Sequence, residues 1–76
     1  MRFLVARYAQ GEETPESVTD VSSVGADAFA RLLEIPTARL TDVYPLQSRH
    51  SDGFHRLTGV ALDLDRFAYF LEVEAD

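Results

Sequence analysis

A chain of 76 residues has room for one domain and one hydrophobic core. It contains no cysteine, which excludes a disulfide framework and a thiolate metal site. Its net charge of −6 argues against direct binding to nucleic acid, which needs a cationic surface. Neither a signal peptide nor an apolar run of roughly 20 residues, the length of a membrane span, is visible. We therefore expect a cytoplasmic protein of one domain, residues 1–76.

The first part of the chain has the pattern of a β-hairpin. Residues 3–8 are rich in apolar and aromatic side chains, and residues 17–22 contain three β-branched side chains, as strands commonly do. Residues 10–15 between them include Gly11 and Pro15, which are typical of a turn. We predict two antiparallel strands joined by a loop of moderate length.

The first predicted helix spans residues 24–34. It contains several alanines, which favour helix, and large apolar residues recur at helical spacing, namely Phe29, Leu32 and Leu33. Ser23 is a candidate cap for its N-terminus. Pro36 is expected to end the helix, because the residue before a proline avoids the α region.

A loop over residues 37–44 and an extended stretch over residues 44–46 are expected to lead to a second helix. This helix is predicted between residues 48 and 58, with one face formed by His50, Phe54 and Leu57. Gly59 is well placed as its C-terminal cap.

Residues 67–75 show the clearest strand pattern, because alternate side chains of a strand point to opposite faces. One face carries Phe67, Tyr69, Leu71 and Val73. The other carries Ala68, Phe70, Glu72 and Glu74. The predicted fold is therefore an α+β two-layer sandwich. It has a three-stranded antiparallel sheet in the order β-β-α-α-β, with the first strand central and two short helices on one face.

The other face of such a sheet stays open unless something covers it. Both faces of residues 3–8 are apolar, so apolar surface reaches the open side whichever face is buried. An apolar patch rimmed by charge often marks a protein interface. The alternative is that residues 37–46 fold over this face and bury it.

Acidic residues gather in two stretches of the chain. Residues 8–30 hold five acids and no base, and residues 60–76 hold five acids and one arginine. Acid beside exposed aromatics suits recognition of a basic protein, because opposite charge speeds encounter and buried aromatics supply affinity. Excess acid can also serve solubility alone. The candidate partner-binding residues are Glu12, Glu13, Glu16, Asp20, Phe70, Glu72 and Glu74.

Catalytic patterns are weak. Ser48, His50, Ser51 and Asp52 have the residue types of a hydrolase triad. However, helix neighbours one or two positions apart do not face each other, and a triad needs a nucleophile–base contact with a separate orienting group. A helix start with polar caps is the favoured interpretation, and no enzyme activity is expected.

Metal-binding patterns are equally weak. His50 and His55 are five residues apart, unlike the i, i+4 spacing of a helical zinc pair. We expect His50 to be a half-buried packing residue and His55 to be solvated. Asp63 and Asp65 offer two carboxylates without further ligands. The sequence therefore predicts neither a metal nor a cofactor.

The tail Leu64-Asp65-Arg66-Phe67-Ala68-Tyr69-Phe70-Leu71-Glu72 is the most distinctive motif of the chain. Together with the initial hairpin and the Leu33-Glu34-Ile35-Pro36 helix ending, it resembles the cloacin-type colicin immunity proteins and a group of small bacterial proteins related to them. The resemblance implies a small acidic antiparallel-sheet protein that neutralises the basic nuclease domain of a bacteriocin. It also implies that the open acidic face binds the toxin.

The expected function is therefore a non-enzymatic protein-binding module, of which an immunity protein is the specific form. One alternative is a regulatory or structural homodimer that buries the same face against itself. Another is an acidic mimic of nucleic acid that occupies a DNA-binding protein.

Overall fold

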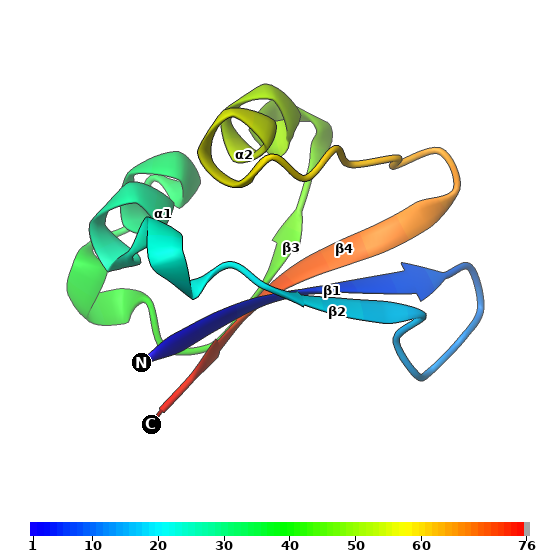
Figure 1. Ribbon diagram of the computed structural model, residues 1–76, viewed down its shortest axis with the longest axis horizontal. Helices are drawn as coiled ribbons and strands as arrows, with labels where there is room; N and C mark the ends of the chain where they lie inside the picture. Colours follow the sequence, from blue (N-terminus) through cyan, green and yellow to red (C-terminus); the bar gives the residue numbers. More distant parts are fainter. Residues whose placement is uncertain (76) are drawn as a thin grey trace.

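The computed structural model of the protein describes residues 1–75. Its strands and α-helices are β1 Arg2–Ala9, β2 Ser17–Asp20, α1 Ala26–Leu33, β3 Val43–Leu46, α2 Ser51–Thr58 and β4 Phe67–Glu74. Short 3₁₀ turns occupy Ser22–Val24, Thr37–Arg39 and Ser48–His50. Within this part of the chain, the sheet order is β2-β1-β4-β3 and each neighbouring pair is antiparallel. Both helices lie on the same side of the sheet (Figure 1).

The predicted α+β class, the antiparallel sheet and the place of the first strand between its hairpin partner and the last strand are confirmed. The prediction of three strands is wrong, because Val43–Leu46 forms a fourth strand beside β4. β3 has only four residues and contains Pro45. Proline is tolerated in an edge strand, because its missing N–H can face solvent and no hydrogen bond between strands is lost. A short strand with a proline has little local signal, so its pairing depends on β4.

The start of the first helix also differs from prediction. Ser23 does not cap it: Ser23 lies in a 3₁₀ turn, and the N-cap position is Gly25 with φ 92° and no capping side chain. Glycine suits this position because a positive φ strains other residues. The helix ends at Leu33, one residue before the predicted end.

The second helix agrees in part with prediction. Its first turn, over residues 48–50, is 3₁₀ rather than α-helical. Gly59 caps the C-terminus in the left-handed conformation, as predicted, with φ 78°. Of the predicted apolar face, His50 and Phe54 are buried, whereas Leu57 is 39% exposed.

The core lies between the helices and the sheet. Phe29 of α1 is fully buried, with its ring centroid 5.2 Å from that of Phe3 and 6.1 Å from that of Phe54. Tyr69 and Leu71 of β4 face the same core, which confirms the predicted inner face of this strand. Phe3 and Val5 belong to the core as well. This decides the orientation of β1: Leu4, Ala6 and Tyr8 point to the other side of the sheet.

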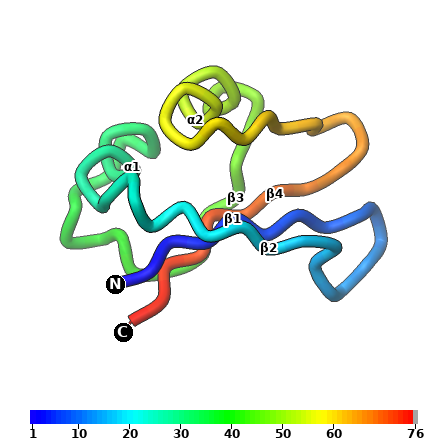
Figure 2. The backbone as a smooth tube through the Cα atoms, in the orientation of Figure 1, coloured from blue at the N-terminus to red at the C-terminus, as the bar shows by residue number. Residues whose placement is uncertain are grey.

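The chain between α2 and β4 runs without regular secondary structure from α2 to the right-hand end of the molecule in Figure 2, where it turns back into β4. The hydroxyl of the buried Tyr69 accepts a hydrogen bond from the Asp63 N–H at 3.1 Å, and the Phe67 N–H donates to the Asp63 carbonyl at 3.0 Å. These contacts fix the point at which β4 begins. The backbone of Asp63 therefore stabilises this turn through hydrogen bonds of both its N–H and its carbonyl.

Candidate functional site

The side of the sheet away from the helices, called the open face below, is built by all four strands. Residues directly opposite each other in neighbouring strands point to the same side, so the register assigns its members. They are Val18 and Asp20 of β2, Arg2, Leu4, Ala6 and Tyr8 of β1, Ala68, Phe70, Glu72 and Glu74 of β4, and Val43 and Pro45 of β3.

The open face has an apolar centre. Leu4 and Ala6 form its floor, with exposed fractions of 8% and 0%. Val18 and Val43, on the two outer strands, are 51% and 50% exposed. Residues 37–46 therefore extend this face by a strand and do not bury it, as the alternative in the sequence analysis would require.

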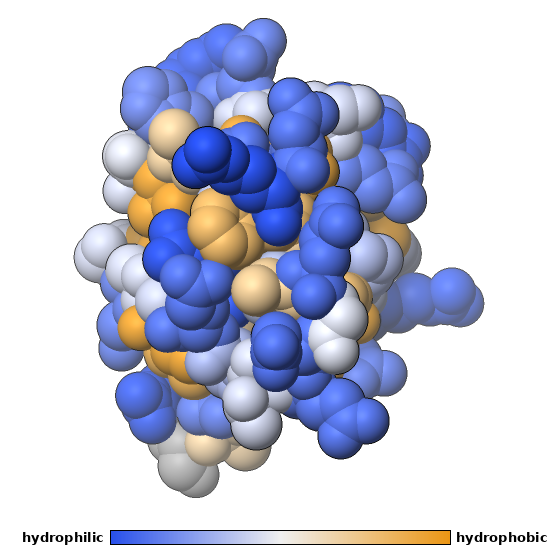
Figure 3. All heavy atoms as spheres, turned by 90° about the vertical axis from the view of Figure 1, so that its right-hand side faces the viewer, coloured by the Kyte–Doolittle hydropathy of each residue, from blue (hydrophilic) through white to orange (hydrophobic). Residues whose placement is uncertain are grey.

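An aromatic pair lies toward one end of the open face. The rings of Tyr8 and Phe70 meet edge to face with centroids 5.5 Å apart, a favourable geometry for aromatic pairs. Both side chains are half-buried. Figure 3 views the end of the molecule with the β1–β2 turn, where apolar atoms reach the surface between hydrophilic side chains.

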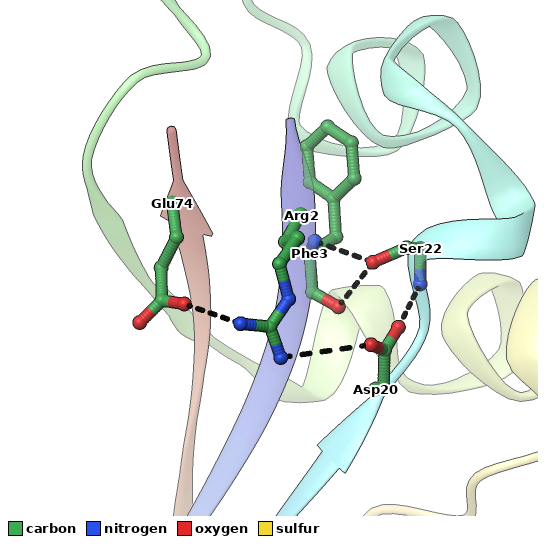
Figure 4. Close-up of polar contacts among 5 residues, drawn as sticks. All are labelled: Arg2, Phe3, Asp20, Ser22 and Glu74. Atoms are coloured by element: carbon green, nitrogen blue, oxygen red, sulfur yellow. Dashed lines mark hydrogen bonds and ion pairs between the residues drawn. The ribbon is translucent and has the colours of Figure 1, made fainter. Parts of the chain in front are cut away.

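At the other end of the open face, Arg2 lies between two predicted site residues (Figure 4). Its guanidinium is 3.5 Å from Glu74 Oε1 and 3.9 Å from Asp20 Oδ2. All three side chains are about half exposed, so these ion pairs contribute little to stability. They nevertheless offset part of the charge of Glu74 and Asp20 before any partner arrives.

Asp20 also has a local structural role. The Ser22 N–H donates to Asp20 Oδ1 at 2.8 Å, and the Ser22 hydroxyl accepts from the Phe3 N–H at 2.9 Å. Hydrogen bonding from the Ser22 side chain and backbone, helped by Arg2, lowers the pKa of Asp20 below its ordinary value. Asp20 is therefore part of the junction that ends β2 as well as a member of the open face.

Glu72 differs from these two acids. It lies on the inner strand β4, directly between Leu4 of β1 and Val43 of β3, and it is half-buried. Within residues 1–75, no ion pair or hydrogen bond engages its carboxylate. A half-buried carboxylate in apolar surroundings is a strong site for an incoming cation, because loss of water there must be offset by a charged partner.

A hollow of about 440 Å³ opens beside Glu72, where the β1–β2 turn meets β4 and β3. Its walls include Tyr8, Phe70, Ala68 and Val43, and its acidic lining residues are Glu72 and Glu12. None of its lining residues is Arg, Lys or His. The hollow, called the acidic hollow below, thus combines aromatic walls with uncompensated negative charge.

The structure brings five of the seven predicted site residues to the open face or its hollow: Glu12, Asp20, Phe70, Glu72 and Glu74. Glu13 is exposed in the β1–β2 turn. Glu16 is separated from the open face. It pairs with Arg7 at 3.5 Å, and Arg7 points to the helix side of the sheet, 4.5 Å above the Phe67 ring.

The set of predicted site residues omitted several lining residues of the hollow, among them Tyr8 and Val43. Strand alternation places Tyr8 on the side opposite Phe3 and Val5, so the burial of that apolar pair was the missing information for Tyr8. Val43 has no comparable local signal, because its place depends on β3 pairing with β4.

Of the residues that resembled a triad, His50 has a structural role. His50 is buried, with 4% exposed, and its Nδ1 accepts a hydrogen bond from the Gln47 N–H at 3.0 Å. It is thus more buried than predicted and serves the start of the second helix, whereas His55 is exposed as predicted. In the described residues, no group of three or more metal-ligating side chains is close enough to hold an ion. None of the helices in residues 1–75 has the length and hydropathy needed to cross a membrane.

Comparison with protein-family models, curated proteins and solved structures gives no match for this chain. The resemblance to immunity proteins therefore stays a prediction from the sequence.

Proposed function

We propose that this protein is a non-enzymatic binding module that recognises a basic protein through its open face. In line with the resemblance stated above, the proposed partner is a nuclease-type toxin. The observation that carries the proposal is Glu72, a half-buried acidic residue between Leu4 and Val43 whose carboxylate has no partner among the described residues. An interface that buries this face would need a cation from the partner opposite Glu72.

The composition of the open face supports this kind of partner. Interfaces gain affinity from buried aromatic and apolar centres, and complementary charge around the centre sets encounter rate and specificity. Leu4 and Ala6 provide the apolar centre, and Tyr8 and Phe70 add an aromatic pair beside it. Glu72 and Glu74 place negative charge beside it on β4.

Charge also argues against self-association through the same face. A two-fold dimer presents the same patch from both copies. The open face and its hollow hold the carboxylates of Glu12, Asp20, Glu72 and Glu74 against the single guanidinium of Arg2. Like charges would therefore meet across such a dimer, which is unfavourable.

The test begins with capture of partners from the source cells by tagged protein at low salt. The captured protein is then identified, purified and titrated. We expect one basic protein whose binding weakens as salt rises, because opposite charges are screened. Glu72→Arg should raise the dissociation constant by more than about thirtyfold, because it places a positive charge against the basic partner.

The matched control is Asp52→Arg, which makes the same charge change at an exposed position on α2. It should leave binding unchanged, because α2 lies on the other side of the sheet. Equal effects of the two changes would contradict the proposal, since net charge rather than the open face would then decide binding. Sedimentation that shows a tight dimer, with no basic partner captured, would favour the homodimer.

A further inference from the structure

We infer that the acidic hollow is a receptor for an arginine side chain of the partner. This inference rests on the proposed function, because it names the group that the open face would take from a basic protein. It is carried by the shape and lining of the hollow and by a contact that the chain already makes within itself.

The lining of the acidic hollow matches the chemistry of a guanidinium. Tyr8 and Phe70, whose rings are in contact, belong to the same lining as the acidic residues Glu12 and Glu72. A guanidinium is planar, stacks on aromatic faces and donates hydrogen bonds to carboxylates at its edge. Ala68 adds a small apolar side chain to the same lining.

The other side of the same strands shows this combination already formed. Arg7 Cζ lies 4.5 Å from the centroid of the Phe67 ring, and Arg7 Nη2 lies 3.5 Å from Glu16 Oε1. One arginine of β1 thus meets an aromatic ring of β4 and a glutamate that immediately precedes β2. The acidic hollow offers an aromatic ring and glutamates on the opposite side of these strands, and its own lining contains no arginine.

Other occupants fit the acidic hollow less well. An apolar side chain would bury Glu72 without a compensating charge, which is costly. A lysine ammonium would satisfy a carboxylate, but it lacks the planar surface that stacks on Phe70. For a bound metal ion, the described residues supply too few ligands, since no group of three or more potential ligands gathers here.

The test is an NMR titration of the whole protein with the peptide acetyl-Gly-Arg-Gly-amide, read from backbone amide shifts. We expect saturable shifts at Gly11, Ala68 and Phe70, which line the acidic hollow. The matched peptide with citrulline keeps the shape of arginine and removes the charge, and it should bind at least about tenfold more weakly. The lysine peptide should fall between the two.

Two conservative variants examine the two parts of the receptor. Glu72→Gln removes charge, and Phe70→Leu removes the ring while it keeps an apolar side chain. Each should weaken arginine-peptide binding severalfold. Asp52→Asn on α2 should not change it.

The inference would be overturned if the citrulline peptide bound as tightly as the arginine peptide. It would also be overturned if the arginine peptide shifted the amide signals of all acidic residues without saturation. This failure is distinct from failure of the proposed function. Suppose that a basic protein is captured and that Glu72→Arg abolishes its binding, but the arginine peptide does not bind. The open face would then stand as the binding surface, and the arginine receptor would be rejected. If the arginine peptide binds but no basic partner is found, only the proposed function would be rejected.

Discussion

His50 is an ionisable side chain enclosed near the start of the second helix, with 4% of its surface exposed. Its Nδ1 accepts a hydrogen bond from the Gln47 N–H, so the neutral imidazole is the form that suits this site. Burial, with help from Arg49, lowers the pKa of His50 below its ordinary value of 6.5, and Glu34 opposes this only in part. Folding and protonation of His50 therefore compete.

The first prediction concerns the pH dependence of stability. The unfolded chain binds a proton at His50 more readily than the folded protein, so the free energy of unfolding rises with pH between the lowered pKa and 6.5. The part of the free energy of unfolding that depends on neutral His50 is fully present above pH 6.5 and is lost as pH falls through the pKa of His50 in the folded protein. Urea unfolding between about pH 8 and about pH 5 should show this decline.

His50→Asn keeps a hydrogen-bond acceptor for the Gln47 N–H but cannot be protonated in this range. It should flatten the profile below pH 6.5. His55→Asn, the same change at an exposed position on α2, should leave the profile as in the wild type. A wild-type profile that His50→Asn does not alter would show that His50 is not the group responsible.

At the scale of elements, the two α-helices end in the same conformation with different residues. Gly59, at the end of α2, has φ 78°, and Glu34, at the end of α1, has φ 58°. Glycine adopts this left-handed region without strain, whereas other residues do so at a cost of about 1–2 kcal/mol. One helix therefore ends on the favoured residue and the other on a disfavoured one.

The second prediction follows from this contrast, and the two substitutions should act in opposite directions. Gly59→Ala should lower the free energy of unfolding by about 1 kcal/mol through the backbone alone, since a Cβ atom at Gly59 would have no heavy atom within 4 Å. Glu34→Gly should raise it by about 0.5–1 kcal/mol. Chemical denaturation followed by circular dichroism measures both changes.

Glu34→Gln is the control for the ion pair between Glu34 and Arg49, whose charged atoms are 3.8 Å apart at an exposed site. It should have little effect, because exposed ion pairs contribute little. If Glu34→Gln were as stabilising as Glu34→Gly, charge rather than backbone conformation would explain the gain.

At the scale of the whole molecule, one side chain joins both helices to the sheet. Phe29 of α1 is fully buried and its ring lies near those of Phe3 in β1 and Phe54 in α2. Within residues 1–75, no helix covers the opposite side of the sheet, and Phe70 there is only half-buried. The two phenylalanines therefore differ in what their removal should cost.

The third prediction is that Phe29→Ala lowers the free energy of unfolding by about 3–5 kcal/mol. This approaches the whole stability of a small domain, roughly 5–10 kcal/mol, so a partly unfolded protein is expected at room temperature. Phe70→Ala should lower it by only about 1–2 kcal/mol. Thermal and urea unfolding of both variants at low protein concentration measures the difference.

Phe29→Leu keeps most of the apolar volume and should be better tolerated than Phe29→Ala, which separates lost packing from any special need for a ring. Equal costs at positions 29 and 70 would contradict the asymmetry of the two faces. A cost at position 70 that grows with protein concentration would indicate that a second copy covers the open face.

The local pattern of the sequence was sufficient for the elements whose signals lie within a few residues. The alternation over residues 67–75 placed Phe70, Glu72 and Glu74 on one side of a strand and Tyr69 and Leu71 on the other, as the structure has them where it describes this strand. Gly59 marked the end of the second helix. These features were predictable because strand pleat and helix capping depend on adjacent residues.

Contacts between distant segments decided the rest, and they decided the composition of the candidate site. Only the pairing of β3 with β4, which sets Val43 opposite Glu72, shows that β3 exists and that Val43 walls the acidic hollow. The burial of Phe3 determined which side of β1 is open, and only the meeting of strand ends gave Arg2 its two acidic partners. Both sides of β1 are apolar and β3 is short, so local preference was too weak to choose, and packing against the rest of the chain made the choice.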